Sequence, residues 1–220
     1  MRSRLLSTSV REDVERAVKV FSNQQQPFLS ERTADSPRAA GDAIQTLLAS
    51  NLAGIVGEEF CINYTSGFAR RAMADMAFDD TAGCHYVVDV KTHRLGTAFN
   101  MPNLTSVERL ARFYAHDDNY FVVLSVSYEI TGISVTATEV RFVPIEFLDW
   151  SCLTIGALGW GQIQIANANR IVLNAAASRR DWMLELCRRL LDFYPRELAK
   201  IQGRIEYFRG VEDVWRQRPS

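Results

Sequence analysis

Three charged residues close together in the sequence have the types needed to hold a metal ion and activate a water. Asp75 precedes a short segment that ends at Gly83, and Asp89 and Lys91 lie in the apolar run that follows. A charge within a stretch built for burial must be paired or bind a metal, because an isolated buried charge is costly. Two adjacent carboxylates favour a hard, oxygen-seeking cation such as Mg²⁺. The sequence therefore predicts a magnesium site at Asp75 and Asp89, with Lys91 beside it.

The segment 85–91 is expected to be a strand, because β-branched and aromatic residues fill it. Side chains alternate along a strand, so Asp89 and Lys91 share one face with His85 and Val87. The opposite face is apolar and carries Tyr86, Val88 and Val90. We therefore expect the charged pair on one side of a buried strand.

A hairpin is expected to bring the two carboxylates together. A three-residue loop that ends in Gly83 would supply the positive φ that such a turn requires. If Asp80 pairs with Cys84, the antiparallel register sets Asp75 opposite Asp89, with Cβ atoms roughly 4.5–5.5 Å apart. A slip of one residue would turn Asp75 to the other face, so the predicted site depends on this register.

An aspartate, a hairpin and then Asp-x-Lys form the signature of the PD-(D/E)XK nucleases. This sequence resembles that family at Ala74-Asp75 and at Asp89-Val90-Lys91, with Ala74 where the motif usually has proline. Further similarity to the HincII-like and EcoRV-like type II restriction endonucleases lies in residues 88–92 and 100–104. The HincII-like branch is also similar at residues 39–42 and 161–165, so the resemblance extends patchily from about Ala39 to the C-terminal helices.

The resemblance implies a mixed α/β (α+β) fold, in which helices flank the central mixed β-sheet of the restriction-endonuclease-like core. It implies a Mg²⁺-dependent enzyme that cleaves double-stranded DNA at a short specific sequence and leaves blunt ends. A palindromic target would call for a homodimer in which each subunit cuts one strand. The glycines of residues 156–161 do not have the order of a dinucleotide-binding loop, so we expect no nucleotide cofactor.

Residue roles follow from the same resemblance. Asp75, Asp89 and Lys91 would be catalytic, and Asp75, Asp89 and the carbonyl of Val90 would hold one or two Mg²⁺ ions. Lys91 would position the attacking water. Thr92 would contact a phosphate, and Asn100 and Asn103 would contact bases, since amide side chains both donate and accept hydrogen bonds. An alternative for Asn103 is the N-cap of a helix over residues 104–114.

The helix expected over residues 41–55 corresponds to one that often carries a glutamate near the metal in that family. Gln45 stands at the aligned position and cannot supply a negative ligand. Asp42, Glu58 and Glu59 are nearby in the sequence, and a solvated helix face is the alternative for each. Whether any of these four residues joins the site stays open, as does DNA contact by residues 156–174.

The composition indicates a globular protein, with 47% hydrophobic and 23% charged residues. The net charge of −1 means that positive charge for phosphate contacts must be local. Four widely spaced cysteines predict buried thiols in a reducing compartment. The sequence contains no secretory leader and no apolar window long enough for a membrane span, so we expect a cytoplasmic protein without a membrane partner.

We expect a single domain over residues 1–220, with residues 1–38 as a helical N-terminal arm. Periodicity predicts a helix over residues 9–22, strands over 120–130, 133–143 and 162–165, and a helix from 181 that restarts at Pro195.

Two other functions remain open. A repair nickase or junction resolvase would keep the fold and change the substrate. A non-catalytic DNA-binding protein would use Asp89 and Lys91 only as an ion pair, and replacement of Lys91 by alanine distinguishes it from an enzyme.

Overall fold

The structure, a computed structural model, describes residues 3–66 and 73–219 of the chain. It divides the chain into two compact units, Met1–Ala175 and Ala176–Ser220. The expected single domain over residues 1–220 stays a prediction, and each unit is described by itself here. The fold is mixed α/β, as predicted.

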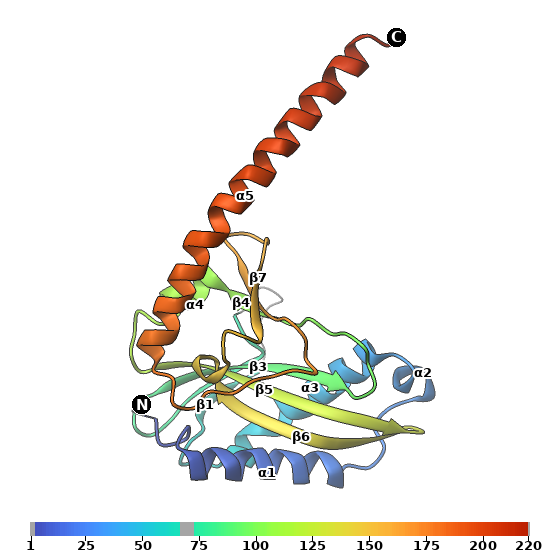
Figure 1. Cartoon of the computed structure of the whole chain (residues 1–220). Helices are drawn as coiled ribbons and strands as arrows, with labels where there is room; N and C mark the ends of the chain where they lie inside the picture. Colours follow the sequence, from blue (N-terminus) through green and yellow to red (C-terminus); the bar gives the residue numbers. More distant parts are fainter. Residues whose placement is uncertain (1–2, 67–72, 220) are drawn as a thin grey trace. The chain divides into compact units, whose positions relative to one another are not determined.

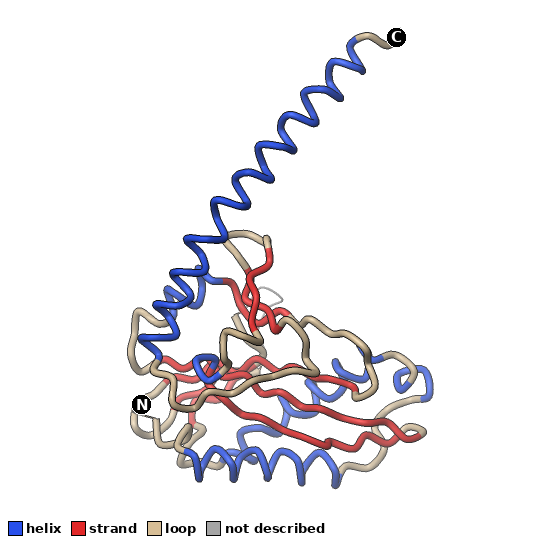
Figure 2. The backbone as a smooth tube through the Cα atoms, in the orientation of Figure 1, coloured by secondary structure: helices blue, strands red, loops and turns tan. Residues whose placement is uncertain are grey.

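A five-stranded mixed sheet forms the centre of the first unit (Figure 2), in the order β1-β2-β3-β5-β6. Its strands are β1 (Ile62–Thr65), β2 (Met76–Asp79), β3 (His85–Arg94), β5 (Asn119–Thr131) and β6 (Ser134–Pro144). β3 and β5 run parallel, and the other neighbouring strands run antiparallel. The two predicted strands after residue 119 are confirmed, and they extend the sheet from β3.

Three helices precede the sheet in the sequence: α1 (Thr8–Gln24), α2 (Glu31–Ala34) and α3 (Pro37–Val56). α1 packs against β6 and α3 packs against β3, so both helices cover the same face of the sheet (Figure 1). Apolar side chains from that face and from the helices form one buried cluster, which includes Tyr86, Val88 and Val90 of β3. The predicted apolar face of β3 is therefore confirmed.

Residues 3–38 pack against the sheet at several buried positions and do not form a separate arm. Leu5 and Val18 are fully buried. Asn23, at the end of α1, donates to the carbonyl of Ala137 and accepts from its amide, at 3.1 and 2.7 Å. The sequence suggested an arm because residues 23–38 are polar, but the apolar positions around them bury against the sheet.

A second, smaller sheet in the first unit is antiparallel and has the order β4-β8-β7. Its strands are β4 (Asn103–Ser106), β7 (Leu153–Gly156) and β8 (Gln162–Ile165). The short helix α4 (Val107–Phe113) follows β4, and the short helix η1 (Ile145–Phe147) lies between β6 and β7. The helix predicted from residue 104 begins later, because Ser106 is its N-cap and accepts a hydrogen bond from the amide of Arg109. Asn103 therefore lies in a strand and is not a helix cap.

The second unit is dominated by α5 (Arg179–Arg216), whose N-cap Ser178 accepts a hydrogen bond from the amide of Asp181. The predicted restart at Pro195 is wrong, because α5 continues through this residue. A proline within a helix removes one backbone hydrogen bond, and here the remaining bonds keep the helix continuous. Among the described residues, no helix has both the length and the apolar character needed to cross a membrane.

Candidate metal and nucleic-acid site

The hairpin that positions the two carboxylates has the predicted register. Its strands β2 and β3 pair Met76 with Val88 and continue to Asp79 with His85. At the turn, the amide of Asp80 donates to the carbonyl of Cys84 at 2.9 Å. The turn residue Gly83 has φ +86°, a conformation that glycine adopts without a steric penalty.

One step beyond Met76, this register sets Asp75 beside Asp89. The amide of Asp75 donates to the carbonyl of Val88 at 3.0 Å, which holds the chain against β3 although β2 begins only at Met76. The two carboxylates therefore belong to neighbouring chain segments at one end of the hairpin, as the sequence predicted.

Both oxygens of the Asp75 carboxylate accept a hydrogen bond. Oδ2 accepts from the amide of Val90 at 2.7 Å, and Oδ1 accepts from Nε2 of Gln45 on α3 at 2.6 Å. The carboxylate thus takes the place of a strand partner at Val90. Because the N–H and C=O of one residue in an extended strand point to the same edge, the Val90 carbonyl is directed to the edge where Asp75 lies.

Asp89 is buried, and its two oxygens have different surroundings. Oδ1 accepts from Nζ of Lys91 at 2.7 Å. Oδ2 is buried and has no hydrogen-bond partner among the residues that the structure describes. Burial raises the pKa of Asp89 to about 7; Lys91 opposes the rise in pKa, and the nearby charge of Asp75 adds to it.

This donor set fits a magnesium ion. Asp75 and Asp89 supply carboxylate oxygens, Val90 supplies a carbonyl, and the unpartnered Oδ2 of Asp89 is the atom that most needs a cation. Among residues 3–66 and 73–219, no group of three or more His, Cys, Asp or Glu side chains is arranged to hold a metal ion. Mg²⁺ does not need such a cluster, because it is commonly held by one or two carboxylates while it retains several waters.

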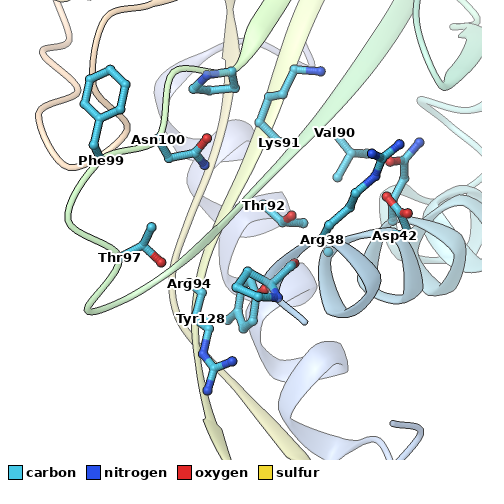
Figure 3. A pocket seen from close by; sticks show the side chains of 14 residues that line it. Arg38, Asp42, Val90, Lys91, Thr92, Arg94, Thr97, Phe99, Asn100 and Tyr128 are labelled. Atoms are coloured by element: carbon cyan, nitrogen blue, oxygen red, sulfur yellow. The ribbon is translucent and has the colours of Figure 1, made fainter. Parts of the chain in front are cut away.

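A pocket of about 370 Å³ adjoins this end of the hairpin, between α3, the end of β3 and the segment before β4 (Figure 3). The predicted site residues that line it are Val90, Lys91, Thr92 and Asn100. Figure 3 shows Lys91, Thr92 and Arg94 along β3, with Arg38 and Asp42 on α3. Asp75, Asp89 and Asn103 are not among the lining residues, and the two carboxylates reach the pocket through their hydrogen bonds to Gln45, Val90 and Lys91.

Thr92 of β3 packs closely against Gly41 of α3. A Cβ atom added to Gly41 would be 2.4 Å from Oγ1 of Thr92, so only glycine allows this approach without a shift. Thr92 is partly buried at the wall of the pocket. Its contact with a phosphate stays a prediction.

The segment that carries the two predicted base-reading residues is held by the β8 region. The carbonyl of Asn100 accepts from the amide of Ala168 at 2.8 Å. The exposed side chain of Asn103 accepts from Nε2 of Gln164, its partner in β8, at 2.6 Å. Contact of either residue with a base stays a prediction.

The four residues left open by the sequence have different positions. Gln45 contacts the site through Asp75, and Asp42 is exposed at the pocket wall. Glu58 and Glu59 are exposed and follow α3, and Glu59 pairs with Arg4 at 2.8 Å. Neither glutamate lines the pocket.

Two arginines near the site were missed in the sequence. Arg38 and Arg94 line the pocket, and Arg94 donates to the carbonyl of Ala34 at 2.9 Å. Ser36 followed by Pro37 is the usual pattern for an N-cap and the first helical residue. That signal would have extended the helix to residue 37 and placed Arg38 on the same face as Gln45.

His93 is buried in β3, and its Nε2 lies 2.8 Å from Oδ1 of Asn169. Three of the four cysteines are buried as predicted, whereas Cys187 is exposed.

The chain matches no protein-family model, and comparison with curated proteins gives no match either.

Proposed function

We propose that this protein is a Mg²⁺-dependent endonuclease that cleaves double-stranded DNA at a short specific sequence. One observation carries the proposal: the buried Oδ2 of Asp89 lacks a hydrogen-bond partner among the described residues, next to a second carboxylate and a lysine. A purely structural ion pair gains nothing from leaving one carboxylate oxygen buried and unsatisfied, since that oxygen loses its hydration. A metal-binding carboxylate needs a free oxygen.

Asp75, Asp89 and the carbonyl of Val90 would hold the ion. When bound, Mg²⁺ supplies a more acidic water and stabilises the charge that the scissile phosphate gains. Asp75 is held in place by Val90 and Gln45, at 2.7 and 2.6 Å. Gln45 therefore orients Asp75 from α3 and adds no negative charge to the site.

Lys91 supplies a positive charge at the same end of the hairpin. Its ammonium group is partly exposed, faces the pocket and contacts Asp89 at 2.7 Å. From this position, the ammonium group would orient the attacking water and stabilise the negative charge on the phosphate. Both tasks depend on a donor aimed where charge develops, which removal of the side chain abolishes.

The surroundings of the site suit a polyanion. Arg38, Lys91 and Arg94 all line the pocket together with the acidic Asp42, although the chain as a whole has a net charge of −1. Thr92 is our candidate for a phosphate contact, and Asn100 is our candidate for base reading. We propose that the fold is that of the restriction-endonuclease-like core. The enzyme would act in the cytoplasm as a homodimer, cut a palindromic target and leave blunt ends.

A non-catalytic DNA-binding protein is the second candidate. The observation that favours it is the 2.7 Å ion pair of Asp89 and Lys91, which is also the contact that a structural role would use. The two candidates differ in what Lys91 does once DNA is bound.

The test is incubation of the purified protein with plasmid and long genomic DNA, in Mg²⁺ or in Ca²⁺, followed by electrophoresis. We expect discrete fragments in Mg²⁺ alone, and sequencing of their ends gives the target and the cut position. In Lys91→Ala we expect cleavage to fall by at least about 10²-fold, while DNA binding in Ca²⁺ is retained. Lys200→Ala removes the same side chain from the exposed surface of α5 and is the matched control.

Three results would count against the proposal. Intact genomic DNA in Mg²⁺ would exclude an endonuclease and favour the non-catalytic DNA-binding protein. Undiminished cutting by Lys91→Ala would exclude Lys91 from the mechanism. Nicking without double-strand breaks would point to the repair nickase of the same fold.

A further inference from the structure

The helix α5 carries an apolar repeat with alternating spacings of three and four residues. The repeat comprises ten positions, here called the seam: Leu184, Cys187, Leu191, Tyr194, Leu198, Ile201, Ile205, Phe208, Glu212 and Trp215. Spacing of this kind places side chains along one stripe of a helix and is the pattern of a two-helix coiled coil. Only Glu212 interrupts its apolar character.

The seam is exposed within the described chain. Leu191 is 73% exposed and Phe208 is 65% exposed. The two buried residues of α5, Trp182 and Leu186, stand on the opposite side of the helix from Leu184, at two residues before and after it. An apolar stripe of this length in contact with water is typical of a surface that binds another protein.

We propose that the seam is an interface with α5 of a second copy of this chain, and that the two helices run antiparallel. At 1.5 Å per residue, Leu184 to Trp215 spans about 47 Å. This inference does not rest on the proposed DNA cleavage, because it concerns the helix alone. Side-chain size and charge along the seam indicate that its partner is a second α5 and that the two helices run antiparallel.

In the antiparallel arrangement, the seam positions of one copy pair in reverse order with those of the other. Trp215 then lies opposite Leu184, and Phe208 lies opposite Leu191 of the second copy. The remaining layers are Tyr194 with Ile205, Leu198 with Ile201, and Cys187 with Glu212. Large aromatic residues are thus combined with aliphatic ones in every layer that contains them, which fills the interface evenly.

Charge beside the seam favours the same orientation. Glu197 and Arg204 flank the seam on one side, and the antiparallel register sets Glu197 opposite Arg204 of the second copy, twice in the dimer. A parallel register would instead set Arg204 opposite Arg209 and would bring the two copies of Glu212 together in the interface. Like charges at such positions are unfavourable.

One contact opposes the antiparallel arrangement. Arg188 would face Arg209 of the second copy, but Arg188 is paired with Glu185 of its own helix at 3.1 Å, which offsets the repulsion. Glu197 is likewise paired within its own helix, with Lys200 at 2.6 Å. The choice of orientation therefore depends mainly on the matched layers and on the separation of the two copies of Glu212.

The first test is the mass of the full chain by sedimentation equilibrium, without DNA or metal. We expect a dimer for the unchanged protein and a monomer for Leu198→Glu, which puts a charge into the central layer. Ala199→Glu adds the same charge one residue away, on an exposed position outside the seam, and we expect it to remain dimeric. A monomeric unchanged protein, or a dimer in Leu198→Glu, would overturn the proposal. Circular dichroism of each variant shows that α5 is still helical.

The second test fixes the orientation through Cys187, the exposed cysteine. In an antiparallel dimer the two copies of Cys187 are roughly 37 Å apart along the axis, at 1.5 Å per residue. Mild oxidation should therefore not link the unchanged protein, whereas Glu212→Cys should give a disulfide-linked dimer. Adding Cys187→Ser to Glu212→Cys should abolish the link.

A parallel dimer gives the opposite pattern. The unchanged protein would be linked through Cys187, and the double variant would remain linked through position 212. Arg204→Glu separates the two registers again, because it weakens the antiparallel dimer and strengthens the parallel one. Linking of the unchanged protein or tighter association of Arg204→Glu would refute the antiparallel arrangement.

Discussion

Replacement of Asp89 by asparagine should stabilise the protein at neutral and alkaline pH when no metal is present. The carboxylate is buried, its Oδ2 is unpartnered among the described residues, and its pKa is raised to about 7. Asparagine has nearly the same shape and carries no charge. It therefore removes the penalty for burying the ionised group.

The sign and size of this change in stability follow from the shift in the pKa of Asp89. A group whose pKa is raised on folding stabilises the folded state only when it is protonated. The contribution of Asp89 to stability is therefore fully present below about pH 4 and is lost as the pH rises to about 7. The rise from 3.8 to about 7 spans about three pH units, each worth about 1.4 kcal/mol, so the loss is about 4 kcal/mol. For a unit of this size, that corresponds to a shift in Tm of roughly 8–16 °C.

Thermal unfolding of both proteins between pH 4 and pH 8 in EDTA measures the effect. We expect the Tm of Asp89→Asn relative to the unchanged protein to increase steadily up to about pH 7 and then to level off. Asp42→Asn, which neutralises an exposed carboxylate at the wall of the same pocket, is the matched control. Added Mg²⁺ at a hundredfold excess over Kd should increase the free energy of unfolding of the unchanged protein by about 2.7 kcal/mol and so raise its Tm. It should leave the Tm of Asp89→Asn unaffected.

A difference between the two proteins that does not vary with pH would refute the reasoning. It would mean that Asp89 is ionised at little cost in the folded protein, because water or another group stabilises its carboxylate. A loss of stability in Asp89→Asn at pH 8 would show that the ion pair with Lys91 outweighs desolvation.

Two further substitutions test the packing around the site. Gly41→Ala should lower the free energy of unfolding by about 1–3 kcal/mol, because its Cβ would lie 2.4 Å from Oγ1 of Thr92. Adding Thr92→Ala should restore most of the loss in urea titrations, and equal instability of the single and double variants would contradict this contact. Gln45→Glu should lower the Tm in EDTA, because it sets a carboxylate against Asp75 in place of a donor at 2.6 Å. Mg²⁺ should recover more stability in this variant than in the unchanged protein, and an unchanged Tm in EDTA would show that Gln45 does not position Asp75.

The hairpin could be predicted from the sequence because its determinants are local. The β-forming residues after Gly83, the turn itself and the pairing of Asp80 with Cys84 all lie within a few residues of one another. They set the register, and the register sets Asp75 beside Asp89. Local steric and hydrogen-bonding preferences are enough for such an element.

The second sheet could not be predicted in the same way. Asn103 looked like a helix cap because an apolar periodic run follows it, but pairing with Gln164 in β8 draws it into a strand. Pro195 looked like a helix boundary, yet α5 continues through it. The capping preference of Asn103 is modest, and strand pairing overrides it. The penalty of a proline inside a helix is larger, about 3 kcal/mol, and the backbone hydrogen bonds on both sides of Pro195 outweigh it.

Local sequence is therefore enough to predict the types and the register of the charged residues: two carboxylates and a lysine at one end of a hairpin. Their surroundings depend on how the whole chain packs. That packing buried Asp89 and left one oxygen unpartnered, brought Gln45 from α3 to Asp75 across 30 positions of sequence, and set the pocket beside Lys91. Those properties depend on which distant segments exclude water from the site, and burial is a property of the packed chain, which no short stretch of sequence determines.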